Sequence, residues 1–453
     1  MTTLRLLGAA LLAAFERLDH VAIMLRIGIT ALAVYPALRF AVLALSDDYG
    51  PTPLDELLAL ALLPLAIWTL RRGETLQRII TVGFGIYALF GLLGALVHRN
   101  QGLSQPLAAL YDIALDAKLL IILLGATAIF REARKPERLM HRAAWLVVIL
   151  ALLNAPFVLR DLLCEEGISL RGEPLLPRLG FFQPHGLLGH HLESLWLSFT
   201  AALAAFYLAR VSEQRSIMML AAGLSALVLA HLSVKEGLAL LAGASIVLLD
   251  RPVMRADMAV RVPLAICAAF AVWTLTPLGE LTVRQLETYT GTAGRPTQVR
   301  TILTRESFVI AQQFFPLGSG AGSYASPPSF QFGYSDVYVR HGLSGLWGAS
   351  ANTANHLLDV FWPKVIAQSG FVGAAFYLVT ILLMGRPAVR AYLETGTAEA
   401  SLAVGMLVSM LIISVAATPF THEWLAPVLA TTLAFHMSLL RRPGAAPRRG
   451  GLQ

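Results

Sequence analysis

Long apolar stretches separated by short polar connections dominate the pattern of hydrophobic and polar positions along the chain. A stretch of about 20 apolar residues can cross a bilayer as one helix. The pattern predicts an all-α polytopic membrane protein with about twelve transmembrane helices. The predicted spans are 21–45, 54–70, 79–97, 107–130, 143–159, 186–209, 216–232, 237–249, 259–276, 364–384, 402–418 and 424–440.

Two connections are much longer than the others, 160–184 between spans five and six and 277–363 between spans nine and ten. Loops of more than about 15 residues are usually functional or disordered. The longer connection contains an amphipathic stretch at 300–315, so we expect it to fold as a large, partly helical loop. The predicted organisation is spans one to nine in 1–276, a loop subdomain in 277–363, spans ten to twelve in 364–440 and a tail in 441–453.

Composition and charge support a membrane protein and exclude a soluble enzyme. Of 453 residues, 56% are hydrophobic and 14% are charged, whereas soluble domains usually carry about 25% charged residues. The net charge of +7 could indicate nucleic acid as a partner. The basic residues, however, concentrate in the connections on one side of the predicted spans, which orients a membrane protein with that side in the cytoplasm. We therefore expect both termini to be cytoplasmic and no nucleic-acid partner.

Ionisable side chains beside the predicted spans are functional candidates, because burying one unpaired costs several kcal/mol. On the predicted outer side they form four groups. The first runs from Arg178 to Glu193, before span six, and includes His185, His190 and His191. Three histidines could indicate zinc, but a zinc site needs a fixed ligand geometry. Adjacent residues point about 100° apart on a helix, so polar packing at the interface is the competing interpretation.

The second and third groups each carry a cation and glycine. The second is the tight turn 233–237, in which Lys235 either forms a local ion pair with Glu236 or acts in function. The third is Arg305 followed by the run 316–324, which includes Gly318, Gly320, Gly322 and Tyr324. Glycines at alternate positions let the backbone bend and approach a ligand closely, although they could also serve only a turn.

The fourth group, 354–373, leads into span ten. His356 and Asp359 are three residues apart and would share one helical face, with Lys364 close by. A carboxylate and a histidine beside apolar surface suit general-base chemistry; the alternative is that Asp359 caps a helix locally. Arginine binds phosphate oxygens bidentately, so cations on the outer face at membrane level predict a lipid-linked phosphate as substrate.

These four segments, in this order, resemble the Wzy/O-antigen ligase superfamily of bacterial polysaccharide polymerases and ligases over residues 178–373. The stretch RLGFFQP at 178–184 with Leu188 and Gly189 resembles the family's segment before a span. The turn 233–241 is similar to its serine-x-x-arginine turn, with Lys235 where arginine is usual. Arg305 and the run 316–324 resemble its loop helix and glycine run.

The resemblance implies a GT-C-like, metal-independent and inverting glycosyltransferase without a cofactor, in the bacterial inner membrane with a periplasmic site. The donor would be a glycan on undecaprenyl diphosphate, and the acceptor would be a glycan hydroxyl. Arg178, Lys235 and Arg305 would bind the diphosphate, and Asp359, with His356 as neighbour or substitute, would be the base. The substrate groove would include His185, Glu193, Gly320, Gly322, Tyr324 and Trp362.

Three alternatives remain at this point. Asp359 and Trp362 are typical of polymerases in the family, whereas a histidine near this position would indicate an O-antigen ligase that transfers the polysaccharide to lipid A-core. A transporter or flippase would explain buried charges such as Arg26, Arg39 and the Asp116–Lys118 pair. A non-catalytic scaffold is the third. A polymerase is expected to work beside a flippase and a chain-length regulator.

Overall fold

The computed structural model describes residues 18–45, 52–72, 74–164, 166–175, 177–178, 181–248, 299–346, 348–351, 357 and 360–440. Predicted span nine, the tail at 441–453 and both candidate bases, His356 and Asp359, lie outside the described residues.

Helices lie at every predicted span within the described residues. They are α2 (Leu18–Leu45), α3 (Leu54–Arg72), α4 (Thr75–His98), α5 (Gln105–Glu132), α6 (Pro136–Leu162), α7 (His191–Ser212), α8 (Arg215–Ala230), α9 (Val234–Leu248), α16 (Phe361–Thr395), α17 (Ala398–Ile413) and α18 (Leu425–Leu439). Within the described ranges, six helices (most of α2 and the whole of α4, α5, α6, α7 and α16) are long and apolar enough to cross a membrane. The protein is an all-α membrane protein, as predicted.

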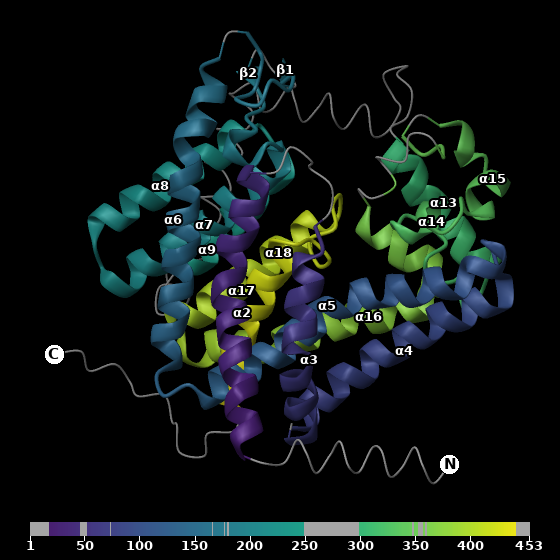
Figure 1. Ribbon diagram of the computed structural model, residues 1–453, viewed down its shortest axis with the longest axis horizontal. Helices are drawn as coiled ribbons and strands as arrows, with labels where there is room; N and C mark the ends of the chain where they lie inside the picture. Colours follow the sequence, from purple (N-terminus) through teal and green to yellow (C-terminus); the bar gives the residue numbers. More distant parts are fainter. Residues whose placement is uncertain are drawn as a thin grey trace.

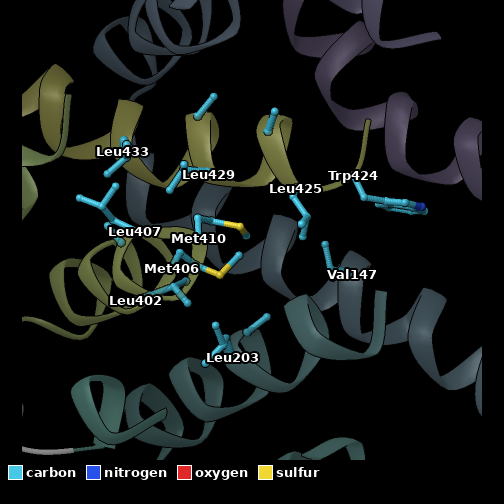
Figure 2. Close-up of a cluster of buried hydrophobic side chains, with 14 of the residues drawn as sticks. Val147, Leu203, Leu402, Met406, Leu407, Met410, Trp424, Leu425, Leu429 and Leu433 are labelled. Carbon is cyan, nitrogen blue, oxygen red and sulfur yellow. The ribbon is translucent and has the colours of Figure 1, made fainter. Parts of the chain in front are cut away.

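Helix α7 is the centre of one half of the fold. In its most apolar 18-residue window 94% of the residues are buried, against 11% in α2. A helix that is apolar all round is buried on all sides, and α6, α8, α9 and α17 pack around α7. Figure 2 shows this core, where Leu203 of α7 lies near Met406 of α17, and Leu429 of α18 lies beyond Met410. Helix α2, in which only 11% of the corresponding window is buried, lies at the periphery of this half.

The other half is built on α4, α5 and α16, which run side by side in Figure 1. Their interface is aromatic: the rings of Tyr87 in α4 and Tyr377 in α16 lie 4.5 Å apart, edge to face. At one end of these helices sits part of the predicted loop subdomain, which includes α13 (Val299–Gln313), α14 (Pro328–Gln331), α15 (Asp336–Arg340) and the 3-10 turn η3 (Leu343–Gly345). Helix α13 confirms the amphipathic helix predicted at 300–315.

Short elements shape the remaining connections. Two-residue strands β1 (Pro177–Arg178) and β2 (Phe181–Phe182) pair antiparallel within the connection before α7. The 3-10 turns η1 (Gly102–Ser104) and η2 (Gly186–Leu188) precede α5 and α7. The loop subdomain has a small core of its own, in which Leu303 and Ile310 of α13 pack with the buried Tyr324 and Tyr338.

Candidate functional site

Two side chains of α6 hold the connection that precedes α7. The Asp161 carboxylate accepts hydrogen bonds from the backbone N–H groups of His185 and Gly186 at 3.0 and 2.8 Å. The Asn154 side-chain oxygen accepts one from the N–H of Leu187 at 2.8 Å. These bonds satisfy backbone donors that would otherwise be buried without partners. They also fix the position of His185, whose side chain is buried.

The first and second predicted groups are linked through Trp196 and His231, which lie just outside them. The side-chain amide of Gln183 donates to the carbonyl of His231, in the turn between α8 and α9, at 3.1 Å. The indole N–H of Trp196 in α7 donates to Glu236 Oε1 at 3.3 Å, and the hydroxyl of Ser233 donates to the other oxygen of the same carboxylate. The turn 233–236 is thereby tied to the first turns of α7.

The second and fourth predicted groups meet at the connection between α17 and α18. Lys235 Nζ donates to the carbonyl of Ala416 at 2.7 Å and lies 3.6 Å from Glu236 Oε1. Trp362, in the first turn of α16, donates its indole N–H to the hydroxyl of Ser414 at 2.9 Å. The side chain of Lys235 keeps 26% of its surface exposed, so its ammonium can reach a further anion.

The glycine run of the third group inserts between α4, α5 and α16, next to the fourth group. The N–H groups of Ser319 and Gly320 donate to the carbonyls of Ala367 and Gln368 at 2.8 and 3.0 Å. Those carbonyls are free because α16 is interrupted at Gly370, whose φ is 67° and ψ 179°. A break in a helix leaves carbonyls of the preceding turn without their helical donors, and here the loop supplies the donors.

The glycines allow close contact with helix backbones. Gly320 has φ 98° and Gly322 φ 76°. A Cβ atom at Gly320 would lie 2.5 Å from Cα of Ala95 in α4, and one at Gly322 would lie 2.7 Å from the carbonyl carbon of Ala108 in α5. Tyr324, the third member of this part of the predicted groove, is also buried. The structure therefore places these three residues in the packed interior, where the glycines face helices instead of an open groove.

A buried ionic cluster joins Arg39 of α2 to two carboxylates. Arg39 is 2% exposed; its Nη2 lies 3.1 Å from Glu193 Oε1 in α7, and its Nη1 is paired with Glu423. The Thr52 hydroxyl accepts from Arg39 and donates to Glu423. Two carboxylates and one guanidinium give the cluster a net negative charge, which repels a further anion. This cluster is therefore unsuited to binding a diphosphate. It gives Glu193, predicted to line the groove, an ion-pair role.

His422 extends this cluster. Its Nε2 lies 3.3 Å from Glu193 Oε1, and its Nδ1 accepts the N–H of Trp424 at 3.2 Å. With Nδ1 accepting, the ring proton lies on Nε2 and is donated to Glu193. Burial lowers the pKa of His422, against the opposing effect of Glu193, so the ring is neutral near pH 7.

Lys364 forms a second buried cluster with α5. Its Nζ lies 3.0 Å from Asp112 Oδ1 and 2.7 Å from Asp116 Oδ1. Asp116 also accepts the Tyr87 hydroxyl at 2.5 Å, and Asp112 accepts the N–H of Gly322 at 3.0 Å. The cluster links α16, α5, α4 and the glycine run. The ammonium group of Lys364 therefore has a structural role, in which it holds these segments together.

The expected pairing of Asp116 with Lys118 is wrong. Residues two apart on a helix do not face each other, and Lys118 instead pairs with Asp55 and, at 2.9 Å, with Glu56 of α3. Of the other charges expected to be buried, Arg39 is buried and Arg26 is exposed to the surroundings of α2.

Arg305 lies on the open surface of α13. Its side chain is 80% exposed, and its Nη2 lies 3.1 Å from Glu306 Oε1. Glu306 also accepts from His341 Nδ1 at 3.1 Å, and His341 Nε2 lies 3.0 Å from Gln313 Oε1. Sequence reasoning missed His341, because 35 residues separate it from Glu306 and no local spacing links them.

The histidines of the first group have structural contacts. His190 is the N-cap of α7, and its Nδ1 accepts the N–H of Leu192 at 3.3 Å. Its ring lies 4.6 Å from that of His191. Burial, and then the nearby His190, lowers the pKa of His185. In the part of the chain that the structure describes, no group of three or more His, Cys, Asp or Glu residues could hold a metal ion. Arg178 ends β1, opposite Phe181.

The four predicted groups thus form a continuous chain of contacts, although they are far apart in sequence. Groups one and two are joined by Trp196 and Glu236, two and four through residues 414–416, and three and four by Gln368, whose side chain donates to the carbonyl of Tyr324 at 2.6 Å. No protein-family model and no curated protein matches this chain.

Proposed function

We propose that the protein is a polysaccharide polymerase of the inner membrane, with about twelve spans and a GT-C-like arrangement. It transfers a glycan from undecaprenyl diphosphate to the hydroxyl of an acceptor glycan at the periplasmic face. The transfer inverts the anomeric configuration and needs neither metal nor cofactor. Both termini lie in the cytoplasm, and a flippase and a chain-length regulator work beside it.

The observation that carries this proposal is the contact chain between the four groups. Hydrogen bonds from residues in or next to these groups join group one to group two and group three to group four, and Lys235 and Trp362 both donate to residues in 414–416. The resemblance to the polymerase and ligase superfamily rests on the same four segments. A transporter would use a broken helix to bind substrate with the freed backbone groups. In α16 the chain's own loop binds those groups.

The proposed roles follow from charge and exposure. Arg305 and Lys235 keep exposed surface and, with Arg178, stabilise the departing lipid diphosphate. Fixed cations near a developing charge lower the barrier without having to reorganise during the reaction. Asp359, with His356 beside it, takes the proton of the acceptor hydroxyl as the oxygen attacks the anomeric carbon. His185, Glu193 and Trp362 support the walls around these groups.

The test is the size of the glycan products in deletion cells complemented with the wild-type chain, Asp359→Ala, Arg305→Ala or Lys235→Met at matched protein levels. Arg340→Ala is the control, because Arg340 is a half-exposed arginine of the same loop subdomain, 3.7 Å from Asp336. We expect Asp359→Ala and Arg305→Ala to lower the polymerisation rate by roughly 100-fold or more, as loss of a general base or of one charge-stabilising group does. Arg340→Ala should polymerise normally.

The products separate the alternatives. Single repeat units on the lipid in deletion cells, and long chains after complementation, support a polymerase. Long lipid-linked chains that persist without the protein, with only their transfer to lipid A-core lost, would identify a ligase. Repeat units trapped on the inner leaflet would overturn the enzyme assignment and identify a transporter.

A further inference from the structure

An apolar cavity of about 320 Å³ lies within the membrane part of the fold. It is bordered by α2, α5, α6, α7, α17 and α18. Its wall includes Leu32, Ile129, Val147, Ala204, Met406 and Val428, one from each of these helices. Helix α2 forms the side of the cavity nearest the surface of the fold, and few of its residues are buried.

Among the buried polar side chains in the wall of the cavity, only the indole N–H of Trp424 lacks a hydrogen-bond partner within the described residues. The hydroxyls of Thr200, Thr431 and Thr432 each donate to a carbonyl of their own helix, at 2.9, 2.7 and 2.9 Å. The hydroxyl of Tyr35 donates to the carbonyl of Glu423. A buried water needs two to four polar partners, and apolar cavities stay dry and bind apolar molecules. A hydrocarbon chain fits this wall, and water does not.

The cavity opens toward the bilayer beside α2. Ile29 and Ala33 line it and are also exposed on the surface of α2. They lie between Arg26 and Arg39 along the helix, and a helix rises 1.5 Å per residue. Both residues therefore lie at the depth of the hydrocarbon core, where lipid chains surround the protein.

A cation marks one end of the cavity. Arg142, in the second turn of α6, lines it and is exposed. No hydrogen bond or ion pair joins Arg142 to any of the residues that the structure describes. The positive-inside pattern places this end at the cytoplasmic surface, where basic residues between helices bind the phosphates of anionic lipids. The aliphatic part of an arginine side chain can pack along apolar surface while its guanidinium group remains in water.

We propose that one acyl chain of an anionic phospholipid from the cytoplasmic leaflet occupies this cavity, with the lipid phosphate at Arg142. The proposal goes beyond the glycosyl transfer and does not depend on it. The chain fills the space behind α2, the helix that carries Arg39 into the buried ionic cluster. The bound lipid therefore supports the position of α2.

Trp424 provides the readout, because its indole lines the cavity and lies at the edge of the core in Figure 2. The purified chain is reconstituted into vesicles that contain brominated phosphatidylglycerol or brominated phosphatidylcholine. Bromine on an acyl chain quenches tryptophan fluorescence by contact. The contribution of Trp424 is the difference between the wild-type chain and Trp424→Phe. We expect phosphatidylglycerol to quench this contribution at low mole fraction and phosphatidylcholine to do so only at high mole fraction.

Two pairs of exposed positions provide variants with matched controls. Arg142→Gln should raise the mole fraction needed for half-quenching about fivefold, as loss of one basic residue near an anionic surface does, whereas Arg138→Gln, one turn earlier, should not. Ala33→Phe fills the mouth of the cavity and should abolish quenching of Trp424. Ala37→Phe, one turn further along α2 and outside the cavity wall, should leave it unchanged.

Other results would overturn the proposal. Trp424 that neither lipid quenches would mean that no chain enters, and equal quenching by both lipids would remove the role of the phosphate. Equal effects of the two arginine variants, or quenching that survives Ala33→Phe, would place the lipid elsewhere. Release of the quenching by one equivalent of undecaprenyl phosphate would mean that the cavity takes a polyprenyl chain instead.

Discussion

Gly320→Ala tests whether the glycine run is packed between helices. The glycine has φ 98°, a backbone conformation that side chains other than glycine rarely adopt. The added methyl group would lie 2.5 Å from Cα of Ala95 and 2.8 Å from the carbonyl carbon of Gly94, both in α4. Neither neighbour is a flexible side chain, so either the loop or α4 must move.

The expected loss of stability has two parts. The left-handed conformation costs a residue with a Cβ about 1–2 kcal/mol. Forcing an extra methyl group into a packed site costs about 1–3 kcal/mol. Together they predict a loss of roughly 2–5 kcal/mol, which corresponds to a fall of about 2–5 °C in the Tm of a chain of 453 residues. The hydrogen bonds of Ser319 and Gly320 to the interrupted α16 should weaken as well, because the loop carries both donors.

Gly342→Ala is the matched control. Gly342 has φ 67°, and a Cβ there would meet nothing within 4 Å. Only the conformational cost of about 1–2 kcal/mol applies, so Tm should fall by only about 1–2 °C. The assay is thermal unfolding in detergent, followed by intrinsic fluorescence at constant lipid content. If Gly320→Ala is no less stable than Gly342→Ala, the run does not lie against α4 and the inferred insertion is wrong.

Three further outcomes test the buried polar groups. Arg39→Gln should destabilise the protein by about 3–5 kcal/mol, because two carboxylates remain buried without their cation; a Tm equal to that of the wild-type chain would contradict the ionic cluster. Lys364→Met should cost a similar amount for the same reason, and adding Asp116→Asn should recover part of the lost Tm; no recovery would argue against the pair. Burial lowers the pKa of His185 below its ordinary value near 6.5, so the unfolded state binds a proton first as the pH falls. Stability from this source is complete above pH 6.5 and falls below it; His185→Gln should flatten the dependence of Tm on pH there, and an unchanged slope would refute it.

Much of the fold could be predicted from hydropathy. Helices such as α4 and α6 follow from their apolar length alone, because a backbone in lipid must satisfy its hydrogen bonds within the segment. The amphipathic period at 300–315 predicted α13, and the positions of four polar groups were evident from charge beside apolar runs. These features depend only on residues close together in the chain, so they can be predicted from the sequence alone.

The candidate site was predicted only as a set of segments. The residues 233–236 and 414–416 are about 180 positions apart, and no spacing rule indicates that Lys235 donates to Ala416. His422 and His341 were missed for the same reason. Their partners, Glu193 and Glu306, come from helices distant in sequence, so only the packing of those helices brings the groups within hydrogen-bonding distance.

The partners of the buried charges show the same division. Hydropathy indicated that Asp116 and Lys118 lie in a span, and this was correct. The cation that pairs with Asp116 is decided by the helix that packs against it, and this cation is Lys364 of α16. Lys118 lies on another side of α5 and pairs with Asp55 of α3. The interruption at Gly370 is likewise set by a loop some 50 residues earlier that supplies the donors for its carbonyls. The hydropathy pattern along a chain indicates whether a residue lies in an apolar or a polar environment. The partner of a buried charge is decided only when the helices pack.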